Sequence, residues 1–295
     1  MHIFVSTKIT TTYMSKKWVF SLCIGMITIT GFAQEKIKGN KNVTTIETNI
    51  EDFNTIRFGE KFEIELVQSD AASVEIETDE NLHDVIRFSV KDSVLTFKTS
   101  AKIQSSKRLN ITVNITKSLH TIEVNKDAEV SAASTLKNDT LELRINDYAK
   151  AFLNVRNNSF KLINNNKSTF GISSKSKLNI ESNEVILELS ENSKTEALIE
   201  TDSLQVDMYQ SAFAKIEGDV DYMNLTTINS SDFSAKNLAT NTCNIVTEDS
   251  SDAEIQVLNE LTIETSGSSD VTIYGDPKIN LNSFKDTSAI RKKEL

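Results

Sequence analysis

Three aspartates in the second half of the chain have the spacing of a candidate chemical site. Asp232, Asp252 and Asp270 each end a Ser-Ser-Asp triplet, and they lie 20 and 18 residues apart. If these segments stack, the carboxylates come within about 5–10 Å of one another, and calcium favours such oxygen ligands. Some polysaccharide-cleaving enzymes also use paired carboxylates. The triplet is good turn chemistry in its own right, because its side chains bond to nearby backbone N–H groups. We expect a structural corner, with a cation site and catalysis as the alternatives.

A cysteine and two histidines are the other possible source of chemistry. Cys243 with His83 or His120 would supply a nucleophile and a base. The position of Cys243 is filled in other copies of a repeat by Leu204, Met223 and Leu261. We therefore expect a buried apolar side chain and no catalytic pair. No catalytic, metal or cofactor set stands out elsewhere, so the sequence predicts a protein that is not an enzyme.

Aromatic residues offer few candidate sugar-binding faces. The only Trp lies in the first 33 residues, and the tyrosines are scattered. We expect Tyr209 and Tyr274 to cover edges or turns, and Phe213 and Phe233 to lie in the core. Asn157-Asn158 and Asn164-Asn165-Asn166 suggest ladders of side-chain amides along a corner, with a binding groove at these residues as the alternative.

The elements that must position these residues alternate with period two. Phe62, Ile64 and Leu66 alternate with Glu63 and Glu65, as expected for strands with one buried face. Similar alternation continues through most of the chain, and the one weak helix candidate is 80–88. Because the chain has only 8 Gly and 1 Pro, we expect Asn and Asp to form the turns.

The alternating segments are copies of one unit. Four segments superimpose, and they begin at Ser203, Tyr222, Thr242 and Glu260. Looser copies begin at Leu141, Phe160, Val185 and Ile279. A unit of about 18–26 residues with short strands and a polar corner is typical of one coil of a solenoid. The sequence predicts an all-β solenoid built from stacked coils of about 18–26 residues. A β-sandwich is the alternative, but it would not repeat the same corner triplet.

Several segments resemble a known family. They are Phe53-Asn-Thr-Ile, the run from Phe62 to Asp70, Asn81-Leu, Val94-Leu-Thr-Phe and the run from Ser266 to Lys278. Over about 45–292 they are similar to the putative auto-transporter adhesin, head GIN domain family of exported bacterial proteins. The resemblance implies that the solenoid is a right-handed parallel β-helix-like fold, and the biochemical role of the family is not established. The sequence departs from the family pattern in having few corner glycines, with Ser266-Gly267-Ser268 retained.

The N-terminus has the three parts of an export signal. Lys16 and Lys17 precede an apolar run from Trp18 to Phe32, and Ala33 supplies a small residue for cleavage. We therefore expect an upstream start plus a secretory signal peptide over 1–33, with Met14 a possible true start. A short linker over 34–44 and a single solenoid over 45–292 follow. Within the solenoid, 45–118 is expected to be less regular and 119–292 to hold the regular repeats.

Removal of residues 1–33 makes the chain more acidic. It would leave 29 basic residues against 42 acidic ones and a single cysteine, so no internal disulfide is expected. Such a charge repels phosphate backbones, so we expect no nucleic-acid partner, and the mature chain is not expected to insert into a membrane. Lys278 and the run 291–293 are candidate caps for one end of the stack, and 45–61 for the other.

These observations favour an exported protein of the periplasm, the cell surface or the medium. We expect a non-enzymatic, adhesin-like protein that interacts with a protein or glycan of the cell envelope. One alternative is a protein that binds or cleaves polysaccharide with a column of carboxylates; a groove gathering three or more carboxylates with Arg or Tyr would favour an enzyme. A purely structural spacer is the other alternative.

Overall fold

The computed structural model describes residues 35–166, 169–170 and 179–295. The chain divides into two units, Met1–Glu35 and Lys36–Leu295, and nearly all described residues belong to the second. The expected signal peptide therefore lies outside the described residues. In the described part of the chain the fold is almost entirely β, and a single 3-10 turn, Glu80–Leu82, interrupts the strands.

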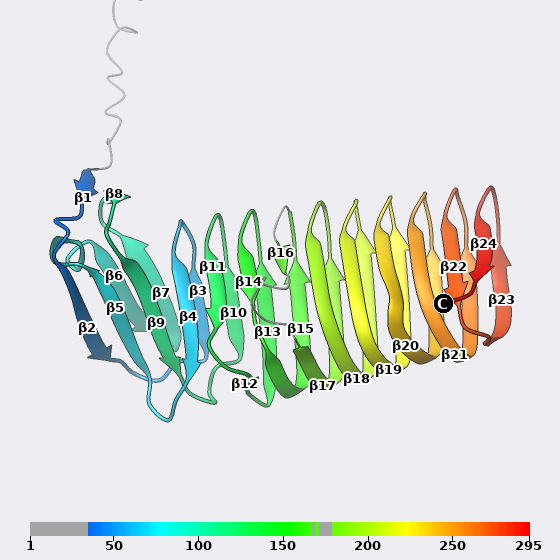
Figure 1. The fold of residues 1–295 in the computed structure, drawn as a ribbon, viewed down its shortest axis with the longest axis horizontal. Helices are drawn as coiled ribbons and strands as arrows, with labels where there is room; N and C mark the ends of the chain where they lie inside the picture. Colours follow the sequence, from blue (N-terminus) through cyan, green and yellow to red (C-terminus); the bar gives the residue numbers. More distant parts are fainter. Residues whose placement is uncertain (1–34, 167–168, 171–178) are drawn as a thin grey trace, which may run out of the picture. The chain divides into compact units, whose positions relative to one another are not determined.

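Most of the second unit is a stack of parallel strands (Figure 1). These strands are β10 (Thr121–Val124), β11 (Glu129–Ala132), β12 (Leu136–Lys137), β13 (Thr140–Ile145), β14 (Lys150–Phe152), β15 (Val155–Asn164), β16 (Thr169–Phe170), β17 (Asn179–Leu189), β18 (Lys194–Tyr209), β19 (Phe213–Ile228), β20 (Asp232–Thr247), β21 (Asp252–Thr265), β22 (Asp270–Tyr274), β23 (Lys278–Phe284) and β24 (Ala289–Lys293).

Neighbouring coils are paired in parallel and nearly in register. Ser203 pairs with Tyr222, Tyr222 with Thr242, and Thr242 with Glu260, so these coils advance by 19, 20 and 18 residues. The predicted β-solenoid is confirmed, with about eight stacked turns. The four segments that superimpose in the sequence are these paired strands, because in-register stacking places equivalent residues of each copy beside one another.

The core consists of columns of inward-facing apolar side chains. One column contains Leu204, Met223, Cys243 and Leu261, all with 0% of their surface exposed. Each coil contributes one residue to each column, so no coil buries its apolar face alone. This dependence on neighbours explains why the alternation of apolar residues is maintained from coil to coil.

Corners of the solenoid use the left-handed backbone conformation. Asn229, Asp249 and Gly267 occupy equivalent corner positions, with φ angles of 59°, 56° and 71°. The prediction that Asn and Asp replace glycine is thus confirmed at this corner, since both tolerate positive φ. In the Ser-Ser-Asp triplets that follow, Ser231 and Ser251 are buried and the aspartate begins the next strand.

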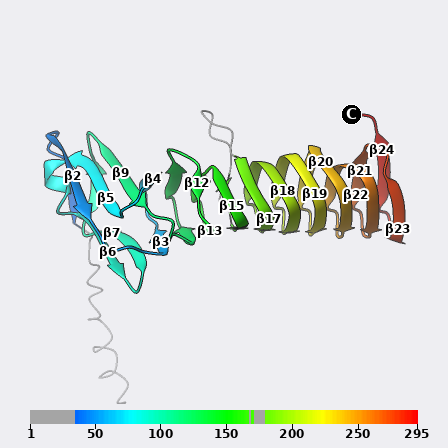
Figure 2. The same ribbon diagram turned by 90° about the horizontal axis from the view of Figure 1, so that it is seen from below.

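The first part of the unit is arranged differently. Its strands are β1 (Lys36–Lys38), β2 (Val43–Asn49), β3 (Thr55–Phe58), β4 (Glu63–Gln68), β5 (Ser73–Asp79), β6 (Ile86–Lys91), β7 (Val94–Thr99), β8 (Lys102–Ser105) and β9 (Leu109–Ile115). β2, β5 and β9 form an antiparallel sheet and β6 and β7 a hairpin, while β7 and β9 pair in parallel with β3 and β4 of the first coil. These added strands cover the first coil of the stack (Figure 2).

Two details of this region differ from expectation. The helix predicted over 80–88 is wrong: it is limited to the 3-10 turn Glu80–Leu82, because Ile86 already begins β6 and pairs with β7. The span expected to be a linker, 34–44, contains β1, which pairs in parallel with β8. Asn81 further ties this span down, since its side chain bonds to the backbone of Lys38 and Asn40.

Candidate functional site

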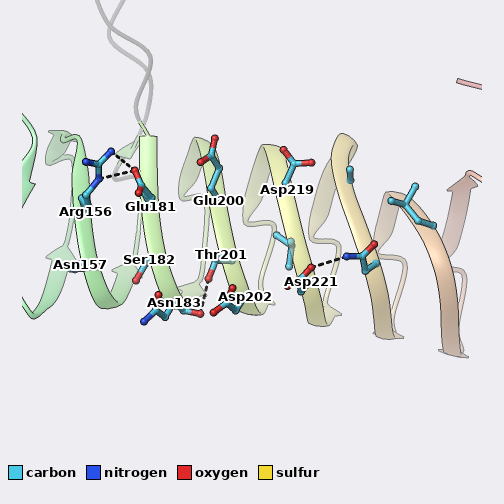
Figure 3. Close-up of a pocket in the computed structure, with 14 residues that line it drawn as sticks. Arg156, Asn157, Glu181, Ser182, Asn183, Glu200, Thr201, Asp202, Asp219 and Asp221 are labelled. Carbon is cyan, nitrogen blue, oxygen red and sulfur yellow. Dashed lines mark hydrogen bonds and ion pairs between the residues drawn. The ribbon is translucent and has the colours of Figure 1, made fainter.

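A groove of about 760 Å³ runs across several coils of the solenoid (Figure 3). One wall consists of Arg156, Glu181, Glu200, Asp219 and Ala239, and the other of Asn183, Asp202, Asp221 and Asn241. Asn157, Ser182, Thr201 and Val220 form the floor between them, and Leu258 lies at one end. The volume is typical of a ligand-binding pocket, but the lining is far more polar than that of most small-molecule sites.

Register alone explains why these residues form rows. Arg156 pairs with Glu181, Glu181 with Glu200, and Glu200 with Asp219, so each coil adds one residue to the first wall. The second wall lies two residues further along each strand. Because residues i and i+2 of a strand point to the same side, both walls project outward and the residue between them faces inward.

Hydrogen bonds between coils fix several groove residues. Arg156 donates from Nε to Glu181 Oε2 over 2.7 Å and also forms an ion pair with it. Asn241 donates to Asp221 Oδ1 over 2.7 Å, and Asn259 donates to Asn241 Oδ1 over 3.4 Å. Both ends of the groove are therefore fixed by contacts between neighbouring coils.

The middle of the groove is strongly acidic. Its walls carry five carboxylates against the single Arg156, which is engaged with Glu181. Glu200, Asp202, Asp219 and Asp221 are exposed, and these groups accept hydrogen bonds. On the floor, both polar atoms of the Asn157 side chain are buried and have no hydrogen-bond partner in the described part of the chain. The groove is thus suited to a ligand rich in hydrogen-bond donors.

A glycine shapes the strand beside this groove. Gly218 has φ of 122°, and a Cβ built there would lie 2.1 Å from the backbone oxygen of Ile199 in the neighbouring coil. Only a residue without Cβ permits this approach. Gly218 thus holds β19 against β18 directly before Asp219.

The aspartate column lies elsewhere on the solenoid and is in register. Asp232 pairs with Asp252 and Asp252 with Asp270, as the repeat spacing predicted. Burial, with the charge of Asp252 added, raises the pKa of Asp232; burial, with the charge of Asp270 added, raises the pKa of Asp252. Arg291 Nη1 lies 2.7 Å from Asp270 Oδ2 and relieves part of this repulsion. Within the described ranges, no group of three or more His, Cys, Asp or Glu side chains is arranged to hold a metal ion.

Cys243 is the buried apolar residue that the repeat predicted. Its side chain is fully buried, and burial raises the pKa of the thiol to about 12. His83 bonds to Thr44 in the N-terminal part, and His120 is exposed and directly precedes β10. Neither histidine shares a coil with Cys243, so the structure does not bring a nucleophile and base together.

The aromatic predictions had mixed outcomes. Phe233 is fully buried as predicted, but Phe213 is not in the core. Phe213 precedes Asp232 in the same outward column, and Lys194 lies over its ring at 5.7 Å. The inward position belongs to its neighbour, because strand alternation places only every second residue inside. Tyr209 is 39% exposed, whereas Tyr274 is only 8% exposed.

Amide ladders run along the corners. Asn146 donates to Asn125 Oδ1 over 3.0 Å, Asn165 donates to Asn146 Oδ1 over 3.2 Å, and Ser190 donates to Asn165 Oδ1 over 2.7 Å. Asn158 belongs to a second ladder, in which its Oδ1 accepts from Asn183 over 3.4 Å. The predicted ladders are confirmed at Asn158 and Asn165.

A family model matches most of the chain. The model described as "Putative auto-transporter adhesin, head GIN domain" matches residues 52–178 and again 171–277. The chain belongs to this family. The two matches together cover the solenoid through β22 and the groove within it, in agreement with the resemblance in the sequence.

Solved structures of low sequence identity share the fold. A putative adhesin from Parabacteroides distasonis is 20% identical, with a TM-score of 0.63, over 88% of this chain and all of that one. A putative adhesin from Parabacteroides merdae is 20% identical, with a TM-score of 0.62, over 88% of this chain and 99% of that one. A putative lipid binding protein from P. distasonis is 19% identical, with a TM-score of 0.60, over 88% of this chain and all of that one. These likenesses establish the fold and no more. No curated protein sequence matches the chain.

The adhesin family indicates an exported or cell-surface protein. In the ranges that the structure describes, no helix has the length and apolarity needed to cross a membrane.

Proposed function

We propose that this head GIN domain protein is a non-enzymatic, adhesin-like protein that binds a glycan of the cell envelope in the acidic groove. Export through cleavage near Ala33 is part of this proposal. The observation that carries it is the pair of polar walls, from Glu181 to Asp219 and from Asn183 to Asn241, on a surface of stacked coils.

The spacing of the walls suits a polymer. Adjacent coils repeat every ~4.8 Å, so the walls present acceptors at that interval from Glu181 to Asp219 on one side and from Asn183 to Asn241 on the other. Hydroxyl groups of a sugar chain donate hydrogen bonds to carboxylates and amides, and hydrogen bonds to charged groups contribute about 1.5–3 kcal/mol each. A repeating ligand thus meets a repeating site, whereas a compact metabolite would meet only part of it.

Charge narrows the class of glycan. Five carboxylates against one paired arginine repel uronates and phosphates, and they attract free amino groups. The groove therefore favours neutral or amine-bearing glycans over anionic ones. Chains of glucosamine, N-acetylglucosamine and galacturonate make a matched cationic, neutral and anionic set of probes.

The test compares two variants of the same strand. Glu200→Gln with Asp202→Asn removes two groove charges from β18, while Glu196→Gln with Asp207→Asn removes two charges from β18 outside the groove. We expect the protein to bind the glucosamine or N-acetylglucosamine chains in calorimetry and to ignore galacturonate. The groove variant should bind at least tenfold more weakly, and the control variant should bind as the unmodified protein does. Equal losses in both variants, or preference for galacturonate, would contradict the proposal.

One observation favours a polysaccharide-cleaving enzyme as the second candidate. The groove gathers more than three carboxylates with an arginine, the feature expected of such an enzyme. Release of new reducing ends from a bound glycan, lost in the Glu200→Gln, Asp202→Asn variant, would establish cleavage. If the bound glycan chains stay intact, the protein binds them without cleaving them. If no glycan probe binds, the result would favour a purely structural spacer.

A further inference from the structure

The two ends of the solenoid differ in how their strands are covered. At the first coil, β3 and β4 have neighbours on both sides, because β7 and β9 pair with them from outside the repeats. At the other end, β23 pairs with β21 and β24 with β22, and no strand of the described chain lies beyond them (Figure 2). Within the described residues, β23 and β24 therefore each have one edge that pairs with no strand.

At β23, the apolar columns of the core end in side chains that are exposed to solvent. Leu261 and Ile263 are 0% exposed, whereas their partners in the last coil, Ile279 and Leu281, are 44% and 53% exposed. Phe284, in the same strand, is 52% exposed. These side chains lack the next coil that covers every inner member of their columns.

The edge of β24 is protected in a way that the edge of β23 is not. Lys292 takes the column position that Ile273 fills in the coil before, and its Nζ lies 2.5 Å from Asp276 Oδ1. A charge at an inward position blocks the docking of another strand. The corresponding inward positions of β23 are the apolar Ile279 and Leu281, so β23 retains a surface that a further strand can cover.

Charge argues against a second copy as the covering strand. The last coil, 276–295, has five basic and three acidic residues, although the whole chain has a net charge of −10. If β23 paired with itself in antiparallel fashion about Leu281, Lys278 would lie opposite Phe284 and beside Lys285 of the other copy. Cations would then meet at both ends of the new pair.

We propose that β23 is a docking edge for an extended strand of a partner protein with alternating apolar residues and acidic residues at its two ends. The apolar side chains would cover Ile279, Leu281 and Phe284, and the acids would face Lys278 and Lys285. Addition of a strand to a free edge uses backbone hydrogen bonds for affinity and alternate side chains for specificity. Inside the solenoid the same chemistry operates, since Lys278 and Arg291 both contact acids of the preceding coil.

Two labelled peptides test this proposal. One has the sequence Glu-Glu-Val-Thr-Val-Thr-Val-Glu-Glu, and the other has Lys in place of each Glu. In fluorescence anisotropy with the full protein, we expect the Glu peptide to bind at least tenfold more tightly than the Lys peptide. Leu281→Lys places an inward charge on the edge and should weaken binding of the Glu peptide by at least tenfold. Ile46→Lys, at an exposed apolar residue of β2 outside both the groove and the last coil, should leave binding unchanged.

Each other result would overturn the proposal. Equal binding of the two peptides would show that the edge has no preference for acidic ends. Equal effects of Leu281→Lys and Ile46→Lys would show that the peptide does not bind at β23. Sedimentation of the peptide-free protein as a dimer that Leu281→Lys dissociates would show that a second copy covers the edge. Circular dichroism of each variant identifies any loss of binding that follows from unfolding.

Discussion

Replacement of Asp252 by Asn should stabilise the protein at neutral pH. Asp252 lies between Asp232 and Asp270 in the in-register column, and both neighbours carry the same charge. The replacement keeps an oxygen that accepts hydrogen bonds, so the corner retains its turn chemistry and only the charge is lost. The variant thus separates a structural corner from a cation site.

The size of the effect follows from the spacing of the coils. Carboxylates about 5 Å apart in water repel by ~0.8 kcal/mol, and 0.1 M salt reduces this to about 0.5 kcal/mol. Two neighbours give ~1 kcal/mol, and loss of the attraction between Asp252 and Arg291 offsets part of it. We expect a gain of about 0.5–1 kcal/mol and a rise in Tm of about 1–3 °C. In 1 M salt the gain should fall below about 0.3 kcal/mol.

The pH dependence has a defined sign. Burial and Asp270 raise the pKa of Asp252 in the folded protein, so the folded state binds protons more readily than the unfolded state. Stability from this group therefore falls as pH rises through the folded pKa and recovers as pH falls. The advantage of Asp252→Asn should be present at pH 7 and absent near pH 3, where the carboxyl group is protonated in both states.

Thermal unfolding followed by circular dichroism measures these differences. Asp270→Asn is the matched control, because it removes the ion pair with Arg291 and should yield a smaller gain or a loss. A lower Tm for Asp252→Asn at pH 7 would refute the argument from repulsion. A rise in Tm with calcium that the variant abolishes would instead establish the column as a cation site.

Two further predictions concern the packing of the coils. Gly218→Ala should destabilise the protein by at least about 2 kcal/mol, because the added Cβ meets the backbone oxygen of Ile199 at positive φ. Gly59→Ala, whose added Cβ has its nearest contact at 3.4 Å, should change stability little. Denaturant titration of both variants compares their free energies of unfolding. Cys243 is buried and its pKa is raised to about 12, so it should resist a maleimide in the folded protein and react only in denaturant. A Lys236→Cys replacement supplies an exposed thiol for comparison. Equal reaction rates of the two thiols in native buffer would show that the core around Cys243 is accessible to the reagent.

The solenoid was predictable because its physical cause is local and repeated. Alternation marks the strands, and the copies beginning at Ser203, Tyr222, Thr242 and Glu260 are the strands that pair. The aligned copies also showed which residues share a core column, so Cys243 was assigned to the core from the apolar residues at the equivalent positions. Phe213 was misassigned because it lies at a corner, where one residue of offset exchanges the inner and outer faces.

A groove at Asn157 was considered as an alternative to an amide ladder, but its acidic walls were not predicted, although a signal was present. Asp202, Asp221 and Asn241 each stand one residue before the aligned segments, and Glu200 and Asp219 stand three residues before them. Extending the alignment upstream would have shown two polar columns. Whether these columns border a hollow depends on the shape of the stacked coils, which the order of residues in one copy does not reveal.

The pairing of the N-terminal strands could not be predicted either, for a different reason. β2, β5 and β9 alternate like the coils, and alternation alone does not distinguish antiparallel from parallel pairing. The helix predicted over 80–88 failed similarly, since its apolar residues at Ile86 and Phe88 also fit a strand and the hairpin with β7 decided between the two.

The repeat that builds the fold also limits the length of the groove. Each coil adds one residue to each wall, so the chemistry of the groove depends on two positions per copy. Acidic residues fill the first wall in three successive coils, at Glu181, Glu200 and Asp219, and span about 10 Å. Arg156 precedes them and Ala239 follows, so the row of negative charges ends on both sides, although further coils continue the stack. A ligand held by charge therefore spans only a few sugar units, and longer chains should gain little affinity beyond that length.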